Sequence, residues 1–181
     1  RRIWSALAAS NQMADPAFAS AENLVWNGRF ELPLVDGPLA WRIERSPAWR
    51  VTAAAKEGLD DSTALRIDFN GKENLSFAGV RQTVLIDPGK RYELSFELRS
   101  RELTTDRGLA VEVYSPQDRR VLARSDEIRG TRRWSRTVLT FAAAADVDRV
   151  ELRLQRARSL QLASRLAGTV WLDDVRMVQG R

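Results

Sequence analysis

The chain has 181 residues, of which 44% are hydrophobic, and its formal net charge is +5 at pH 7. It contains no cysteine and no histidine, which excludes disulfides, cysteine nucleophiles, Cys/His zinc sites and Ser-His-Asp triads. No stretch approaches the ~18 consecutive apolar residues of a membrane-spanning helix. These limits predict a single domain with an ordinary hydrophobic core and no membrane span.

The basic charge is carried mainly by arginine, because the only lysines are Lys56, Lys72 and Lys90. The planar guanidinium fork suits carboxylate, sulfate and phosphate groups. Aspartate and glutamate are interleaved with arginine along the whole chain, and no run of a single sign occurs. This pattern argues against nucleic acid as a partner.

Residues 1–22 differ in composition and hydrophobic pattern from the rest of the chain. Ile3, Trp4, Leu7 and Ala8 have helical spacing in an alanine-rich stretch that ends near Pro16. We interpret this segment as a helical flank or the tail of a preceding domain, in preference to an integral part of the next domain. The chain begins with arginine and shows no signal-peptide pattern, so we expect it to be cut from a longer polypeptide.

Residues 23–178 have the pattern of a β-domain. Asp87-Pro88-Gly89-Lys90 predicts a type II turn, and the residues after it alternate strictly between apolar and polar. The apolar residues of 80–86 predict an antiparallel partner, hence a hairpin. Similar alternation recurs near 65–69, 109–113, 134–141, 150–154 and 168–177.

Eight to ten strands without intervening helices predict an all-β fold, an antiparallel two-sheet β-sandwich of the jelly-roll kind. The shared period of two places the apolar members of these strands inside. The predicted interior positions are Tyr92, Leu94, Phe96, Leu98, Val111, Leu139, Phe141, Leu152 and Leu154.

Several motifs occur in a familiar order. They are N-L-V-W-N-G-R-F-E, A-L-R-I, V-R-Q-T-V, P-G-K-R-Y-E-L-S-F, W-S-R-T-V-L-T-F and V-W-L-D-D-V-R-M. In order and spacing they resemble the galactose-binding-like jelly rolls of carbohydrate-binding modules found beside xylanases and glucanases. The resemblance covers residues 23–178. It implies a non-catalytic module of a larger periplasmic, cell-surface or secreted protein, which binds poly- or oligosaccharide on a concave sheet face or in edge loops.

The resemblance also implies a structural calcium ion where the first and last strands meet. The residues that match this motif are Glu31, Asp173 and Asp174. Calcium prefers several oxygen ligands, and carboxylates with loop carbonyls would supply them. The alternative is that Asp173 or Asp174 faces solvent or pairs with an arginine such as Arg176.

The polar positions of the strands supply the candidate sugar-binding residues. If neighbouring strands align, several of these side chains lie together on one open sheet face, with Tyr114 as an aromatic platform and Trp171 on the same polar parity. Arginine forks there would favour an acidic glycan. The candidates are Arg66, Glu97, Arg99, Glu112, Tyr114, Arg153 and Gln155.

Two alternatives concern the same positions. The first is a solvated face of cross-strand ion pairs, in a structural or protein-interaction domain without sugar binding. The second is catalysis by paired carboxylates, which glycosidases hold about 5 to 10 Å apart. Glu93 and Glu97 would lie ~13 Å apart along one strand, too far for that chemistry. Glu97 with Glu112 across strands stays possible, but the chain is predicted not to be an enzyme.

Overall fold

The computed structural model describes residues 15, 18, 23–161 and 164–180. Within them the chain forms two five-stranded sheets in which every strand pairing is antiparallel. Sheet A has the order β1 (Arg42–Ile43), β4 (Phe77–Leu85), β9 (Arg149–Arg156), β6 (Ala110–Ser115) and β7 (Arg120–Arg124). Sheet B has the order β2 (Trp49–Ala54), β3 (Ala64–Asn70), β10 (Ala167–Gln179), β5 (Arg91–Thr104) and β8 (Gly130–Ala142). The predicted all-β sandwich is confirmed.

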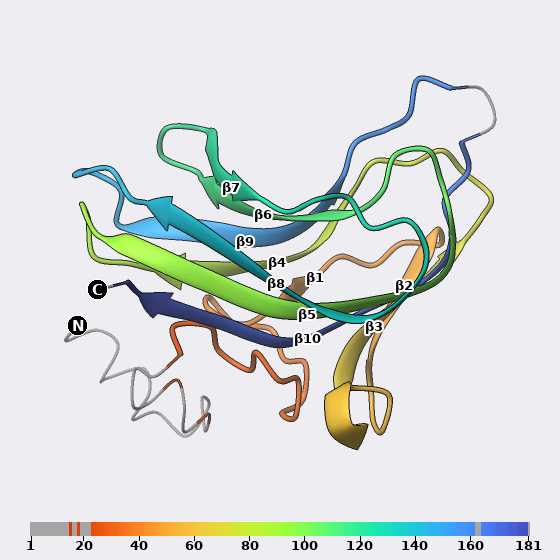
Figure 1. Ribbon diagram of the computed structural model, residues 1–181, viewed down its shortest axis with the longest axis horizontal. Coiled ribbons are helices and arrows are strands. Elements are labelled where there is room, and N and C mark those ends of the chain that lie inside the picture. The colour runs from red at the N-terminus through yellow and green to blue at the C-terminus, as the bar shows by residue number, and fades with distance from the viewer. Residues whose placement is uncertain (1–14, 16–17, 19–22, 162–163, 181) are drawn as a thin grey trace.

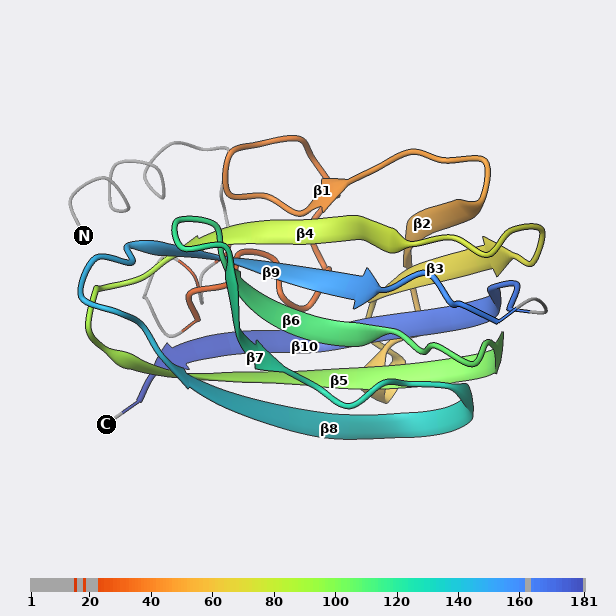
Figure 2. The same ribbon diagram turned by 90° about the horizontal axis from the view of Figure 1, so that it is seen from above.

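The two sheets lie one above the other, with sheet A nearer the viewer in Figure 2. In Figure 1 the strands of both sheets bend upward at their right-hand ends, so the outer face of sheet A lies on the concave side. The outer face of sheet B is accordingly convex. A short 3-10 helix, η1 (Leu59–Asp61), lies in the connection from β2 to β3.

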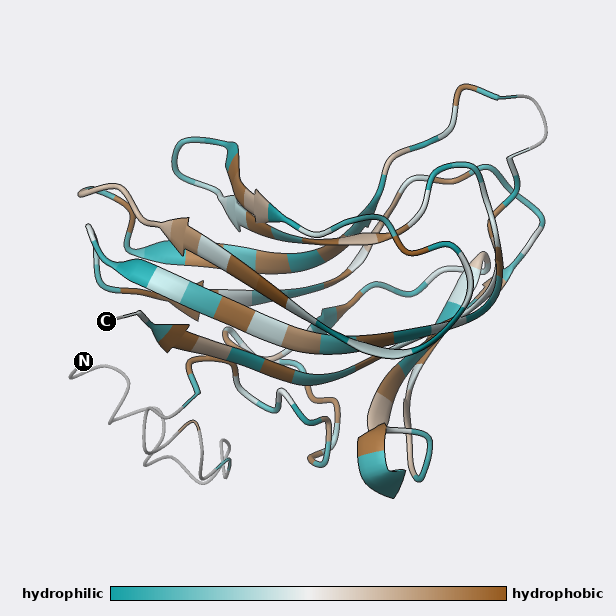
Figure 3. Cartoon of the chain, viewed as in Figure 1, coloured by the Kyte–Doolittle hydropathy of each residue, from teal (hydrophilic) through white to brown (hydrophobic). Residues whose placement is uncertain are grey.

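The core lies between the sheets and follows the alternation of the strands, which Figure 3 shows as bands of hydrophobic and hydrophilic residues. Eight of the nine predicted interior residues are buried, and the ninth, Leu139, is half-buried and packs against the core. Leu139 is less covered because β8 is the edge strand of sheet B. The exposed positions of this edge strand include Arg132, Arg133 and Arg136, charges that discourage pairing with another strand.

The predicted hairpin between 80–86 and the strand after Gly89 is wrong. Gly89 does adopt a positive φ of 70°, as the turn requires, but β4 pairs in sheet A and β5 pairs in sheet B. The turn therefore carries the chain from one sheet to the other. Alternation could not distinguish the two connections, because either one leaves the same apolar side chains inside.

The segment that starts at Asn23 joins the first part of the sandwich to β10. The Asn23 amide nitrogen donates to the Val175 carbonyl at 2.9 Å, and its oxygen accepts from the backbone N–H of Met177 at 3.0 Å. Gly28 is required here, because an added Cβ would lie 2.0 Å from the Val175 carbonyl oxygen.

The helical flank predicted for residues 1–22 lies outside the described residues, except for Asp15 and Phe18. Phe18 is buried in the core, and the Asp15 carboxylate accepts from the backbone N–H of Asn27 at 2.7 Å. Among the described residues, no helix has the length and apolar content needed to cross a membrane.

Candidate functional site

A row of charged residues crosses the outer face of sheet A from edge to edge. Arg42 lies opposite Arg81, Arg81 opposite Arg153, Arg153 opposite Glu112, and Glu112 opposite Arg124. We call these five residues the arginine row. Neighbouring strands lie ~4.8 Å apart, so the row extends over ~19 Å at right angles to the strands.

Carboxylates pair with most of the arginines in this row, but there are fewer carboxylates than arginines. Glu112 is buried and accepts from Arg153 at 2.8 Å and from Arg124 at 3.1 Å. Glu44, next to β1, pairs with Arg81 at 3.0 Å. Arg42 makes no ion pair with any residue that the structure describes. Glu127 also accepts from Arg124, at 3.4 Å. Four guanidinium groups therefore face three carboxylates, and the row keeps a positive excess.

Tyr114 provides an aromatic surface beside the row. The guanidinium carbon of Arg153 lies 3.9 Å from the centre of the Tyr114 ring, so cation and ring are stacked. Gln155, two residues beyond Arg153, lies on the same face and is half-buried. Glu112, Tyr114, Arg153 and Gln155 thus come together as predicted.

The other three predicted sugar-binding residues lie on the opposite side of the molecule. Arg66, Glu97 and Arg99 are on the outer face of sheet B, in β3 and β5. The seven candidates therefore lie on two faces, four on sheet A and three on sheet B, because a period of two fixes only whether a side chain points inward or outward, and not in which sheet. The separation also closes the open alternative of Glu97 acting together with Glu112.

On sheet B, arginine and tryptophan alternate across the strands. Trp171 in β10 lies directly opposite Arg66 on one side and Arg99 on the other. The Arg99 guanidinium carbon lies 4.1 Å from the Trp171 ring centre and 5.1 Å from that of Trp134 in β8. We call Arg66, Trp171, Arg99 and Trp134 the Arg–Trp ladder.

Glu97 lies farther along β5, opposite Arg136, and is buried. Burial raises the pKa of its carboxyl group, whereas the positive charge of Arg136 opposes that rise and the charges of Asp174 and Asp173 add to it. A carboxyl group in this place serves the packing of the sheet and is poorly placed to meet a sugar.

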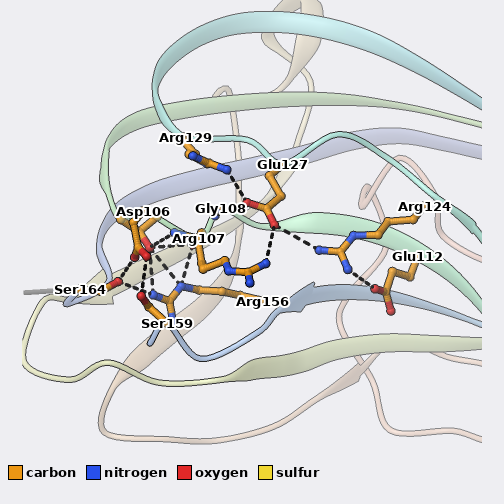
Figure 4. Close-up of polar contacts among 11 residues, drawn as sticks. Asp106, Arg107, Gly108, Glu112, Arg124, Glu127, Arg129, Arg156, Ser159 and Ser164 are labelled. Atoms are coloured by element: carbon orange, nitrogen blue, oxygen red, sulfur yellow. Dashed lines mark hydrogen bonds and ion pairs between the residues drawn. The ribbon is translucent and has the colours of Figure 1, made fainter. Parts of the chain in front are cut away.

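Sequence reasoning missed Arg156, which is fully buried at the end of β9 and joins three loops (Figure 4). It donates to the carbonyl of Leu75 and, at 2.9 Å each, to the carbonyl of Arg107 and the hydroxyl of Thr105. Burial lowers the pKa of its guanidinium group, and the charges of Asp106 and Glu127 oppose this. The available signal was parity, because an arginine follows Leu152 and Leu154 at the next inward position.

A hollow of about 520 Å³ lies at the edge of the sandwich, between the segment 34–36 and strands β1 and β2. Trp41 and Trp49 are among its lining residues, together with Glu44, whose carboxylate pairs with Arg81 of the arginine row. The hollow therefore adjoins one end of the row. Trp41 itself is almost completely buried, whereas Trp49 is half-buried.

The carboxylates predicted to bind calcium already have hydrogen-bond donors. Asp173 accepts from the Leu59 N–H at 2.9 Å, the Ser62 hydroxyl at 2.7 Å and the Asp174 N–H at 2.7 Å. Both oxygens of Glu31 accept from Thr63, at 3.0 and 2.9 Å. Within the described ranges, no three Asp or Glu side chains gather as a metal site would require. These contacts do not fit a preformed calcium site, and calcium stays a prediction of the resemblance.

Solved structures supply the comparison, because no protein-family model and no curated protein matches the chain. A family 4 carbohydrate-binding module is 20% identical with a TM-score of 0.60, over 86% of this chain and 99% of that one. A putative sugar binding protein from Bacteroides thetaiotaomicron is 13% identical with a TM-score of 0.62, over 87% and 100%. A family 61 carbohydrate-binding module in complex with β-1,4-galactotriose is 16% identical with a TM-score of 0.54, over 87% and 99%. The chain therefore has the jelly-roll fold of carbohydrate-binding modules.

Proposed function

We propose that the chain is a non-catalytic carbohydrate-binding module of a larger extracytoplasmic protein, and that it binds an acidic polysaccharide across the outer face of sheet A. The likeness to carbohydrate-binding modules supports the general function. The observation that carries the choice of ligand is the arginine row, in which four guanidinium groups face three carboxylates and Arg42 makes no ion pair with a described residue.

The geometry of the row suits a linear polymer that lies at right angles to the strands. Guanidinium groups pair bidentately with carboxylates, so Arg42 and Arg81 are placed to meet the uronate groups of successive sugars. Tyr114, stacked on Arg153, supplies a flat apolar surface for a sugar ring. Gln155 and Glu151, both half-buried on this face, offer hydrogen-bonding groups for sugar hydroxyls.

The face is built for binding and not for hydrolysis. Glu112, the carboxylate at its centre, is buried and held by two arginines. A glycosidase needs one carboxylic acid that donates a proton and a second carboxylate near it. Both oxygens of Glu112 are engaged by arginines, Oε1 by Arg124 and Oε2 by Arg153, so neither is free to meet a glycosidic bond.

The test uses two probes that share one backbone and differ in charge, polygalacturonate and its fully methyl-esterified form. In affinity gels we expect retardation by polygalacturonate at low salt that weakens at ~0.5 M salt, because exposed charge contacts are screened. The double variant Arg42→Ala/Tyr114→Ala should lose most of this retardation. Arg91→Ala removes one arginine at the start of β5 and serves as the control.

The outcomes separate the possible functions. Equal, salt-insensitive binding to both probes would overturn the acidic ligand and leave a module for neutral glycans. No binding to any polysaccharide would favour a structural or protein-interaction domain, in which the ion pairs of Glu112 only stabilise the sheet.

A further inference from the structure

The Arg–Trp ladder on sheet B has two ends with different charge. At the β3 end, Arg66 is neutralised by Glu57 and Asp68, each at 3.0 Å. Glu57 also accepts from the Trp171 indole N–H at 2.7 Å. The positive charge of Arg66 is therefore compensated at this end of the ladder, and the hydrogen bond to Glu57 holds the Trp171 ring in place.

The β5 end has no such compensation. Arg99 donates to the backbone carbonyl of Glu57 at 3.2 Å, and no carboxylate of the described residues lies within ion-pair distance of its guanidinium group. Arg101 lies over the same Trp171 ring at 5.4 Å, is exposed, and likewise makes no ion pair in the described part of the chain. Two positive charges therefore lie side by side with no carboxylate of the described residues paired to either.

Strand β8 adds further charge at the same place. A bulge lies between the pairs Leu98–Ser135 and Ser100–Arg132, so that Arg133 and Trp134 together face Arg99. Arg133 is exposed and makes no ion pair with a described residue. The surface thus combines Arg99, which lies over the Trp134 and Trp171 rings, with Arg101 over Trp171 and with Arg133 next to Trp134 in β8.

Stacking makes these arginines suitable for binding and not only for covering Trp171. A guanidinium group that lies flat on an indole ring is held in one orientation, and its N–H groups remain at the edges for acceptors. Less side-chain entropy is then lost when an anion binds than for a free surface arginine. The cluster joins the half-buried Arg99, which the tryptophan rings orient, to the exposed Arg101 and Arg133, and a chain of carboxylates matches its charge.

We propose that Arg99, Arg101, Arg133 and Trp134 form a second anion-binding surface, which takes the carboxylates of an acidic polysaccharide on the side of the sandwich opposite the arginine row. The choice of polysaccharide as the ligand rests on the proposed function, whereas the anion site itself does not. One module then holds two polysaccharide chains at once, one on each outer face.

The test compares three variants of the full chain. Arg101→Ala/Arg133→Ala changes the ladder surface, Arg42→Ala/Tyr114→Ala changes the arginine row, and Arg91→Ala/Arg158→Ala is a control that removes the same charge as the ladder variant from two exposed positions elsewhere. Binding of short polygalacturonate oligomers is measured by calorimetry. Bridging is measured as the turbidity of long polygalacturonate on addition of the protein. Unfolding midpoints check that each variant is folded.

We expect the ladder variant to bind oligomers on sheet B about three- to tenfold more weakly than the control, the effect of two exposed charge contacts, while its binding on sheet A is unchanged. We also expect turbidity to vanish in the ladder variant and in the row variant, because bridging needs both faces. A ladder variant equal to the control in affinity and turbidity would overturn the proposal. If the ladder variant loses affinity and the row variant does not, the second surface is supported and the binding site proposed on sheet A is refuted.

Discussion

The hydroxyl group of Tyr92 accepts a hydrogen bond from the backbone N–H of Asp87 at 2.7 Å and donates one to the Asp87 carbonyl at 3.1 Å. One side chain of β5 thus holds the turn by which the chain leaves sheet A. The Tyr92 ring is buried and stacks on Phe141 with ring centres 5.5 Å apart. The turn is therefore tied to the core through this residue.

Replacing Tyr92 by phenylalanine should lower the free energy of unfolding by about 1 to 3 kcal/mol, because two backbone groups lose a buried partner while the ring keeps its packing. Urea unfolding followed by tryptophan fluorescence measures the change. Tyr114→Phe, which alters the half-exposed tyrosine of sheet A, is the matched control and should have little effect. An equal loss in both variants would contradict the role given to the turn.

Replacing Arg156 by methionine should destabilise the fold by about 1 to 3 kcal/mol, because the buried carbonyl of Leu75 would lose its donor. Lysine at this position keeps the charge but lacks the planar fork, so it should recover only part of the loss. The unfolding midpoints of both variants in urea test this. A methionine variant as stable as the original would show that the loops hold without the arginine.

Asp106 should make the free energy of unfolding depend on pH in the acidic range. The hydroxyl groups of Ser159 and Ser164 donate to its carboxylate and hold its pKa at about 2, below the usual 3.8. Since the pKa of the folded state is the lower one, the carboxylate stabilises the fold above about pH 3.8, and this contribution is lost as the pH falls toward 2. As the pH is lowered from about 5 to 2, the unfolding temperature should therefore decrease more steeply for the original chain than for Asp106→Asn. Parallel curves would refute the assignment.

Calcium should leave the unfolding temperature unchanged, because Asp173 and Glu31 already accept N–H and O–H donors that a cation would have to displace. Melts in calcium and in a chelator test this directly. A ligand that binds only the folded state adds about 2.7 kcal/mol at a hundred times its dissociation constant. A rise with calcium that disappears in Asp173→Asn would overturn this expectation and establish the site implied by the resemblance.

The sequence was sufficient for the strands and the core because alternation is a local property. Tyr92, Leu94, Phe96 and Leu98 point inward whatever sheet their strand joins. The pairing partners are not local. Arg99 and Arg153 look alike as polar members of half-buried strands, yet they lie on opposite faces of the sandwich because β5 and β9 belong to different sheets.

Because pairing partners are not local, the sequence did not identify some of the residues that the structure adds to the candidate site. Arg42, Arg81 and Arg124 join Arg153 only through the register of strands that lie far apart in the sequence. Each of them alone is an ordinary exposed or half-exposed arginine. Trp171 was recognisable by its polar parity, whereas its stacking on Arg99 depends on the pairing of β10 with β5.

Strand β10 is the last element of the chain and yet the central strand of sheet B, between β3 and β5. At the bulge of β10, the Val175 carbonyl accepts a hydrogen bond from Asn23, which lies 152 residues earlier in the sequence. During synthesis, β3 and β5 leave the ribosome before the strand that joins them, and their edges stay open until β10 (Ala167–Gln179) emerges. Folding is then governed by distant contacts, which makes it slow, and the incomplete chain is exposed to aggregation.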